Sequence, residues 1–293
     1  MTMTKVLNLV NKETSHIKYE VSFFPDGQKD IKIEPSTINE DDAIRLVGRL
    51  NSFSDLELIV CAVKALRRIE VKDIYLYIPY LLGSRSDRDF TEGKGGTSYL
   101  VDVVAPILNG LNCTTITTVD AHSDVAAACI PNLKVIDNNF LMRKVLDDLY
   151  GPNSPDNFNL VSPDGGALKK IHNTADKIGF TGDIITCSKY RDWHGKLSRI
   201  EVPVRVIHLD KDFLIIDDIC DGGRTFTEIA KHIREAQKTA SKTTGKIYLV
   251  VTHGIFSAGI EPLRAVLDGI YCSNSYSDVA EEHQDFVKQV NVF

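Results

Sequence analysis

The chain has 293 residues, of which 43% are hydrophobic and 25% are charged, and its formal net charge is −6. This length is enough for one large or two ordinary domains with a sizeable core, and the composition is ordinary for a soluble globular protein. The negative net charge argues against extensive nucleic-acid binding, although an anionic substrate can still meet a local basic patch.

The six cysteines are scattered along the chain and form no Cys-x-x-Cys pair. We therefore expect reduced, mostly buried thiols of a cytoplasmic protein, and neither a disulfide framework nor a zinc site. We find no signal-peptide pattern at the first residues and no apolar run of membrane length. Membrane association is therefore not expected.

Short apolar segments bounded by polar turns predict the strands of the first half. They lie at residues 6–10, 19–24, 30–34, 74–78 and 114–119. Apolar residues recur at helical spacing from Ser54 to Arg68, with Ser54 or Asp55 as the N-cap. A second helix is expected at residues 97–108, after a charged loop whose length is typical of functional or disordered segments.

The second half of the chain follows a similar plan. Strands are predicted at residues 159–162, 183–187, 213–216 and 247–251, with helices beginning at Ala167 and Thr227. The halves align loosely at two places, 77–87 with 185–192 and 117–120 with 215–218. This weak repeat predicts an α/β fold with two similar domains, residues 1–145 and 146–293. Each would have a mainly parallel sheet flanked by helices, with binding residues at the carboxyl ends of the strands.

The segment from Phe213 to Phe226 combines a buried strand, two acids, a glycine-bearing turn and the start of a helix. Backbone N–H groups at such a turn attract a phosphate. Asp217 and Asp218, at the end of the strand, can accept hydrogen bonds from ribose hydroxyls or face a divalent cation held by that phosphate. The alternative is that the two acids merely end a strand and cap a helix.

This segment resembles the ribose-phosphate binding loop of the type I phosphoribosyltransferase fold, which usually has Thr and Gly where this chain has Gly222 and Arg224. Further segments carry related motifs. They are Phe24-Pro-Asp-Gly-Gln28, Arg85-Ser-Asp-Arg88, Asp120-Ala-His-Ser123, Ser162-Pro-Asp-Gly-Gly166, Lys189-Tyr-Arg191 and Thr252-His-Gly-Ile-Phe-Ser257. Together they resemble the ribose-phosphate pyrophosphokinase (phosphoribosyl pyrophosphate synthetase) family, over roughly Phe23 to the C-terminus. In that family two phosphoribosyltransferase-like domains in tandem convert ATP and ribose 5-phosphate into phosphoribosyl pyrophosphate and AMP.

The resemblance implies an ATP site, in which Phe24 would stack on adenine in a neighbouring subunit and Arg85 would bind phosphate through its planar guanidinium. Its residues would be Phe24, Asp26, Gln28, Arg85, Ser86, Asp87 and Arg88. Gln28 and Ser86 stand where the family usually has Glu and Gln. Without the resemblance, the first segment is a β-hairpin turn and the second is a solvated run of charges.

The resemblance also implies a ribose 5-phosphate site, a magnesium site and a catalytic pair. The ribose 5-phosphate site would consist of Asp217, Asp218, Asp221, Gly222, Gly223, Arg224 and Thr225. Mg²⁺ would be held by His122 and Asp164, although this hard ion prefers oxygen ligands and His122 alone would be a helix-capping or packing residue. Lys189 and Arg191 would stabilise the charge on the phosphorus under attack, unless they belong to a solvated basic loop.

The chain departs from the family at its start, because residues 11–18 leave no room for the helix that normally follows the first strand. We expect a hairpin-like link there and a compact, divergent member, which forms a homo-oligomer of at least two subunits. Two other functions are compatible with the fold. An inactive homologue that regulates a true synthetase would not need Lys189, Arg191, His122 and Asp164 together. A phosphoribosyltransferase that consumes phosphoribosyl pyrophosphate would need only one of the two domains.

Overall fold

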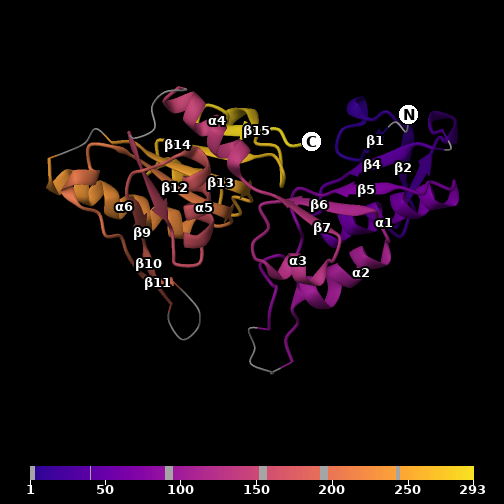
Figure 1. Ribbon diagram of the computed structural model, residues 1–293, viewed down its shortest axis with the longest axis horizontal. Coiled ribbons are helices and arrows are strands. Elements are labelled where there is room, and N and C mark those ends of the chain that lie inside the picture. Colours follow the sequence, from indigo (N-terminus) through magenta and orange to yellow (C-terminus); the bar gives the residue numbers. More distant parts are fainter. Residues whose placement is uncertain (1–3, 40, 90–94, 152–156, 192–196, 242–244) are drawn as a thin grey trace. The chain divides into compact units, whose positions relative to one another are not determined.

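The computed structural model describes residues 4–39, 41–89, 95–151, 157–191, 197–241 and 245–293. The chain divides into two compact units, Met1–Asp137 with Phe293, and Asn138–Val292. Each unit holds its own parallel sheet with helices packed on it (Figure 1), which confirms the expected α/β class. None of the helices in the described part of the chain is long and apolar enough to span a membrane.

The sheet of the first unit has five parallel strands in the order β1-β4-β5-β6-β7. These strands are β1 (Thr4–Asn8), β4 (Ala43–Val47), β5 (Ile74–Tyr77), β6 (Thr115–Val119) and β7 (Leu133–Ile136). The other elements are α1 (Phe53–Arg68), a π-helical segment η3 (Tyr99–Val104), α2 (Ala105–Gly110), α3 (Val125–Cys129) and the short 3₁₀ turns η1 (Lys12–Thr14) and η2 (Pro35–Thr37). Strands β4 and β7 were not predicted from the sequence.

The connection from β1 to β4 is an antiparallel hairpin of β2 (Tyr19–Phe23) and β3 (Lys29–Ile33). Between β1 and β2 the described chain holds only the 3₁₀ turn η1, so no α-helix follows the first strand, as expected; but β1 pairs with β4 and β2 with β3, so the hairpin-like link expected there was wrong. Lys29 fastens the hairpin to α1, because its backbone N–H donates to Glu57 at 3.2 Å and its ammonium donates to the Ser54 carbonyl at 2.7 Å. Ile31 on the inner face of the hairpin joins the same apolar core as α1 and the sheet.

Helix α1 starts two residues earlier than the sequence suggested, because Ser52 is its N-cap. The Ser52 hydroxyl accepts a hydrogen bond from the Asp55 backbone N–H at 3.2 Å, and the Asp55 carboxylate accepts one from the Ser52 N–H at 2.9 Å. This reciprocal capping box satisfies two backbone donors that a helix otherwise leaves unpaired. The predicted N-caps, Ser54 and Asp55, are instead residues of the first turn.

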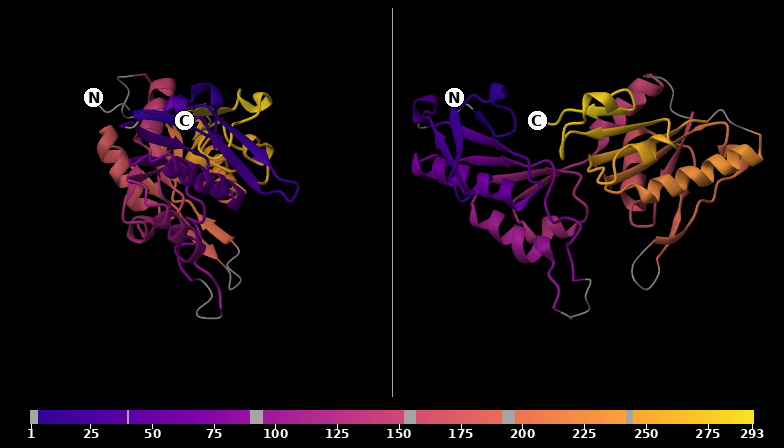
Figure 2. Two further views of the ribbon diagram at one scale, coloured as in Figure 1. Left: turned by 90° about the vertical axis from the view of Figure 1, so that its right-hand side faces the viewer. Right: turned by 180° about the vertical axis from the view of Figure 1, so that it is seen from behind.

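The sheet of the second unit has six parallel strands in the order β15-β14-β13-β12-β8-β9. These are β8 (Phe158–Ser162), β9 (Ile184–Thr186), β12 (Asp212–Cys220), β13 (Ile247–Gly254), β14 (Gly269–Ser273) and β15 (Val287–Val290). The helices are α4 (Asn139–Leu149), α5 (Leu168–Ile178), α6 (Arg224–Thr239) and α7 (Glu261–Arg264), with 3₁₀ turns η4 (Val206–His208) and η5 (Glu281–His283). A two-stranded hairpin of β10 (Ser188–Arg191) and β11 (Leu197–Glu201) projects from this unit (Figure 2).

Both faces of the second sheet are covered, which explains why its strands are almost continuously apolar. Phe213 and Ile215 of β12 pack in one core together with Ile229 of α6, whereas Leu214 packs in a second core together with Leu141 of α4. Because α4 buries its apolar side chains in this second core, the chain enters the second unit at Asn138, ahead of the expected boundary between residues 145 and 146.

Candidate functional site

Strand β12 carries Asp217 and Asp218 within its length, not beyond its end as the sequence suggested. Pairing with β13 continues to Cys220, opposite Gly254, whereas pairing with β8 stops at Ile215. The last part of β12 therefore runs beside the loop that follows β8. In a parallel sheet these carboxyl ends share one edge, where ligands commonly bind.

The acids at this edge influence one another. Burial, followed by the neighbouring carboxylates of Asp218 and Asp164, raises the pKa of Asp217 well above its usual value. Asp218 is 5% exposed, and the Lys170 ammonium of α5 lies 3.8 Å from its carboxylate. Lys170 was not predicted from the sequence, because nothing in the chain links it to Asp218 before α5 packs beside β12.

Asp164 uses its two carboxylate oxygens differently. Oδ1 accepts hydrogen bonds from the backbone N–H groups of Gly166 at 2.9 Å and Ala167 at 3.2 Å, and so closes the turn that leads into α5. Oδ2 lies 3.7 Å from the Lys189 ammonium of β10. The structure therefore brings Asp164 and Lys189 together, and Asp217 of β12 is close enough to Asp164 to interact electrostatically.

The turn after β12 leads directly into α6, which begins at Arg224 instead of the predicted Thr227. Gly223 has a φ of 74°, a left-handed conformation that glycine adopts with little cost. The Asp221 carboxylate accepts a hydrogen bond from the Ser257 hydroxyl at 2.5 Å, which holds the turn against the loop after β13. Arg224 and Thr225 form the first turn of α6, where backbone N–H groups have no acceptor within the helix and can bind an anion.

The predicted ATP-phosphate segment, residues 85–88 of the first unit, presents its two arginines to solvent. Ser86 is engaged inside the protein, because its hydroxyl accepts a hydrogen bond from the Tyr99 N–H at 3.2 Å. Asp87 is only 3% exposed and accepts hydrogen bonds from Arg88. The two arginines are therefore the residues of this segment that are most open to solvent, whereas Asp87 is buried.

The predicted adenine segment is the turn of the β2–β3 hairpin, as expected for this segment without the family resemblance. Phe24 donates its N–H to the Gln28 carbonyl at 2.9 Å, and the Asp26 carboxylate accepts the Gln28 N–H at 3.1 Å. The Phe24 ring is exposed, as is that of Phe23. Asp26 therefore stabilises the turn, while both aromatic rings are available to a ligand or a second chain.

The two predicted magnesium ligands belong to different units, with His122 in the first and Asp164 in the second. His122 is exposed on the loop after β6. Among the residues that the structure describes, no group of three His, Cys, Asp or Glu side chains is placed to hold a metal ion. The side chain of Arg191 lies outside the described residues, although its backbone forms the end of β10.

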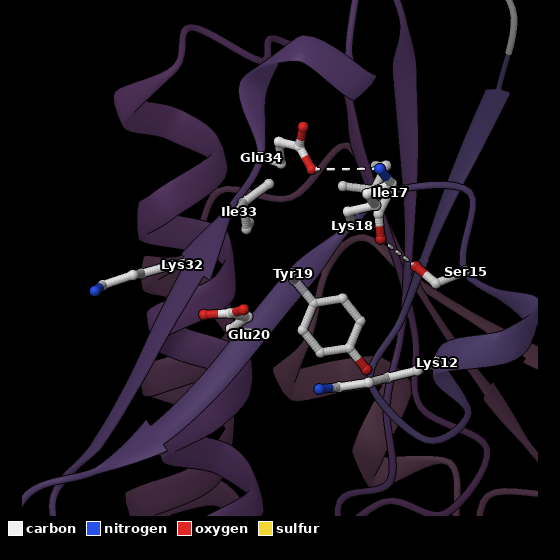
Figure 3. Close-up of a pocket in the computed structure, with 9 residues that line it drawn as sticks. All are labelled: Lys12, Ser15, Ile17, Lys18, Tyr19, Glu20, Lys32, Ile33 and Glu34. Atoms are coloured by element: carbon white, nitrogen blue, oxygen red, sulfur yellow. Dashed lines mark hydrogen bonds and ion pairs between the residues drawn. The ribbon is translucent and has the colours of Figure 1, made fainter.

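A cavity of ≈ 450 Å³ lies in the first unit, between η1 and the β2–β3 hairpin (Figure 3). Its lining residues are Lys12, Ser15, Ile17, Lys18, Tyr19, Glu20, Lys32, Ile33 and Glu34. None of them was predicted as a site residue. Charges of both signs surround it, and Lys18 lies 3.8 Å from the Glu34 carboxylate.

The chain was compared with family models, with curated proteins and with solved structures. No family model matches the chain. It is 27% identical over 267 residues to a ribose-phosphate pyrophosphokinase of Thermosipho africanus, covering 88% of this chain and 78% of the relative. It is 29% identical over 292 residues to the enzyme of that name from Mycoplasma pneumoniae, covering 94% and 82%.

Among solved structures, phosphoribosylpyrophosphate synthetase from Mycobacterium smegmatis matches with a TM-score of 0.79 at 16% sequence identity, covering 99% of this chain and 94% of that one. This match covers both units and confirms the tandem phosphoribosyltransferase-like fold that the sequence motifs implied. The chain is thus a relative of the ribose-phosphate pyrophosphokinases and has the two-domain fold of phosphoribosylpyrophosphate synthetase.

Proposed function

We propose that this protein is a diphosphokinase that transfers the pyrophosphoryl group of ATP to the C1 hydroxyl of ribose 5-phosphate. The hydroxyl oxygen attacks the β-phosphorus and loses its proton, the bond from that phosphorus to the α–β bridging oxygen breaks, and AMP leaves. The observation that carries the proposal is the carboxyl edge of the second sheet, where Asp164, Asp217 and Asp218 gather with Lys189 beside the start of α6. The names of the relatives support the same reaction.

The edge of the second sheet suits a phosphorylated sugar. The first turn of α6 offers backbone N–H groups to the 5-phosphate, and Arg224, exposed at the same turn, adds a positive charge. Asp217 and Asp218 can accept hydrogen bonds from ribose hydroxyls. Because the pKa of Asp217 is raised by burial and by other carboxylates, hydroxyl donors that favour the charged form would relieve part of this unfavourable arrangement.

Lys189 is the group that we propose stabilises the transferred phosphoryl group. Negative charge grows on the phosphoryl oxygens during transfer, and a positioned ammonium stabilises that charge more than it stabilises the bound substrates. Lys189 lies 3.7 Å from Asp164. ATP phosphates would compete with this carboxylate for the lysine, so substrate binding would redirect Lys189 toward the reaction.

Magnesium is part of the proposal. The acids at this edge could supply the carboxylate oxygens that Mg²⁺ prefers, and a divalent cation would offset both the burial and the carboxylate repulsion that raise the pKa of Asp217. When bound with ATP, the ion would neutralise phosphate charge, and Asp164 would be among the residues that hold it. An Asp164→Ala variant should then need more Mg²⁺ for half-maximal activity, and a metal titration like that of the wild type would contradict the ligand role.

One assay tests the reaction. The protein is incubated with ATP, Mg²⁺ and ribose 5-phosphate, and AMP and phosphoribosyl pyrophosphate are measured by chromatography, with sugar-free and metal-free controls. AMP that forms only with the sugar present, in equal amount to phosphoribosyl pyrophosphate, supports the proposal. Absence of AMP under all conditions would reject it and favour a regulatory homologue. A parallel incubation with phosphoribosyl pyrophosphate and nucleobases tests the phosphoribosyltransferase alternative.

We also infer that the protein works as a homo-oligomer in which the β2–β3 turn completes the ATP site of a neighbouring copy. Phe23 is 67% exposed and Phe24 51%, and so large an exposed aromatic surface favours contact with another chain. Sedimentation and specific activity, measured over the same dilution series, test this. Full activity of a monomer would refute the inference.

A further inference from the structure

The loops that follow β5 and β6 carry the predicted ATP-phosphate segment and His122. Their strands are neighbours in the sheet, and two backbone hydrogen bonds continue the pairing past the strand ends. Ile78 donates to the Thr117 carbonyl at 2.9 Å, and Val119 donates to the Pro79 carbonyl at 3.0 Å. The two loops therefore leave the same edge of the first sheet side by side.

Asp87 connects these loops through its buried carboxylate. Oδ1 accepts a hydrogen bond from Arg88 Nε at 2.9 Å, and Oδ2 accepts one from Arg88 Nη2 at 3.3 Å. Oδ2 also accepts a hydrogen bond from the Ser123 hydroxyl of the second loop. The Ser123 oxygen in turn accepts the Val125 N–H at 3.2 Å, at the start of α3.

The contacts around Asp87 fix two groups at once. A carboxylate that binds one edge of a guanidinium sets the plane in which the other donors point. The side chain of Arg88 is 59% exposed, so these remaining donors face solvent. Ser123 directly follows His122, and a bond to its hydroxyl limits the positions open to the His122 backbone.

The start of the second loop is itself constrained. Asp120 has a φ of 45°, a left-handed conformation that costs a non-glycine residue free energy. Its N–H donates to the Ile136 carbonyl of β7 at 2.7 Å. The loop is thus held by β7 at its first residue and by Asp87 at its fourth, with His122 between the two anchors.

We propose that Asp87 is a positioning residue, which aligns the Arg88 guanidinium and the His122 loop by holding Arg88 and Ser123 with one carboxylate. Asp87 is 3% exposed, so it acts through these neighbours and does not itself touch the nucleotide. The hydrogen bonds from Arg88, and then the one from Ser123, keep its pKa below the usual value, so the carboxylate is charged at neutral pH. The inference rests on the proposed function, because it takes Arg88 as a ligand of ATP and His122 as a ligand of the metal, as the family resemblance implies.

The test uses Ser123, whose side chain can be changed with little effect on the core. Ser123→Ala removes the hydroxyl that Asp87 binds, whereas Ser123→Thr keeps it. The loss of one hydrogen bond to a charged group predicts about a tenfold fall in kcat/KM for ATP in the alanine variant. We expect the threonine variant to stay within about threefold of the wild type. Ser123→Ala should melt below the wild type, because it removes a hydrogen bond from a buried carboxylate, so kcat/KM is compared well below the melting temperature of every variant.

Asp42 provides the matched control. It is 8% exposed and bound to the Lys5 ammonium at 2.8 Å, but it precedes β4 and so lies at the opposite edge of the same sheet. Asp42→Asn should lower the melting temperature and leave kcat/KM for ATP unchanged. Asp87→Asn should lower kcat/KM, and adding Ser123→Ala to it should cause little further loss, because the two residues act through one contact.

A Ser123→Ala variant with wild-type kcat/KM for ATP would overturn the proposal, as would a threonine variant that is as impaired as the alanine variant. Calorimetric titration of each variant with ATP and Mg²⁺ separates this result from the proposed reaction. If the wild type binds ATP but forms no AMP, the proposed function fails. Weaker ATP binding by Ser123→Ala, restored by Ser123→Thr, would then still support the positioning role, and equal binding by all three proteins would refute it.

Discussion

Gly223 precedes α6 in the turn proposed to bind the 5-phosphate, and its replacement tests whether this turn has the left-handed backbone that the structure shows. In Gly223→Ala, the new Cβ would lie 3.1, 3.2 and 3.3 Å from three carbons of the Leu263 side chain, in a backbone with a φ of 74°. The left-handed conformation costs an alanine about 1 kcal/mol. Crowding against a buried leucine adds about 1 kcal/mol or more. We therefore expect the free energy of unfolding of the second unit to fall by about 2 kcal/mol.

Gly222 is the control for this measurement, because it is the preceding residue of the same turn. A Cβ at Gly222 would have the Ser257 hydroxyl oxygen as its nearest neighbour, at 3.9 Å, which is an ordinary contact distance. Urea unfolding of both alanine variants, followed by circular dichroism, compares their stabilities with that of the wild type. Gly222→Ala should unfold close to the wild type. Equal stability of the two variants would refute the reasoning, because neither the backbone nor Leu263 would then constrain this position.

Three further predictions follow from the structure. Lys189→Ala should lower kcat by several orders of magnitude and largely spare ribose 5-phosphate binding, because its charge acts in the transition state; steady-state kinetics and calorimetry check both parts. Hydrogen bonds to Lys5 and to a backbone N–H lower the pKa of Asp42, so its contribution to stability is present above pH ~4 and is lost as the pH falls through the folded-state pKa. Urea midpoints measured from pH 7 to 3 should therefore fall less steeply for Asp42→Asn than for the wild type. In the native protein, Ellman's reagent should label the half-buried thiols of Cys61 and Cys129 before the other four, which are buried. Burial also raises the pKa of the Cys113 thiol to about 11 and that of the Cys187 and Cys272 thiols to about 12, so these three thiols are poorly ionised and react slowly. Rapid labelling of four or more thiols in the native protein would contradict this order.

The fold was largely predictable where apolar runs are long and covered on both faces, as in β12 and β13. Strand β4 was missed because Arg45 interrupts its apolar residues. The structure places the Arg45 guanidinium over the Tyr77 ring at 4.5 Å, a contact that the neighbouring strand β5 supplies. The end of β12 was misplaced for a related reason. Asp217 and Asp218 are typical of a strand end, yet pairing with β13 carries the strand past them.

In the candidate site, the residues that the structure brings together were predictable where a motif is contiguous and were missed where they depend on packing. Asp164 was identified from Ser-Pro-Asp-Gly-Gly, and the structure places it beside Lys189. Lys170 and Ser123 were overlooked, because each meets its acidic partner only after a helix or loop packs against another strand. The sequence offered one weak signal for each of them: Ser123 follows the acidic strand end at Asp120, and Lys170 follows the acidic turn at Asp164.

Each unit has its own apolar interior, and the described core residues of the first unit are separate from those of the second. The two halves can therefore lose their structure one at a time. Lys189, the acids of β12 and the turn proposed to bind the 5-phosphate all lie in the second half, so the proposed turnover requires that half to be folded. Activity should therefore be lost over the same urea concentrations at which the second half unfolds. A ligand that stabilises the second half would extend the range of conditions in which the protein works.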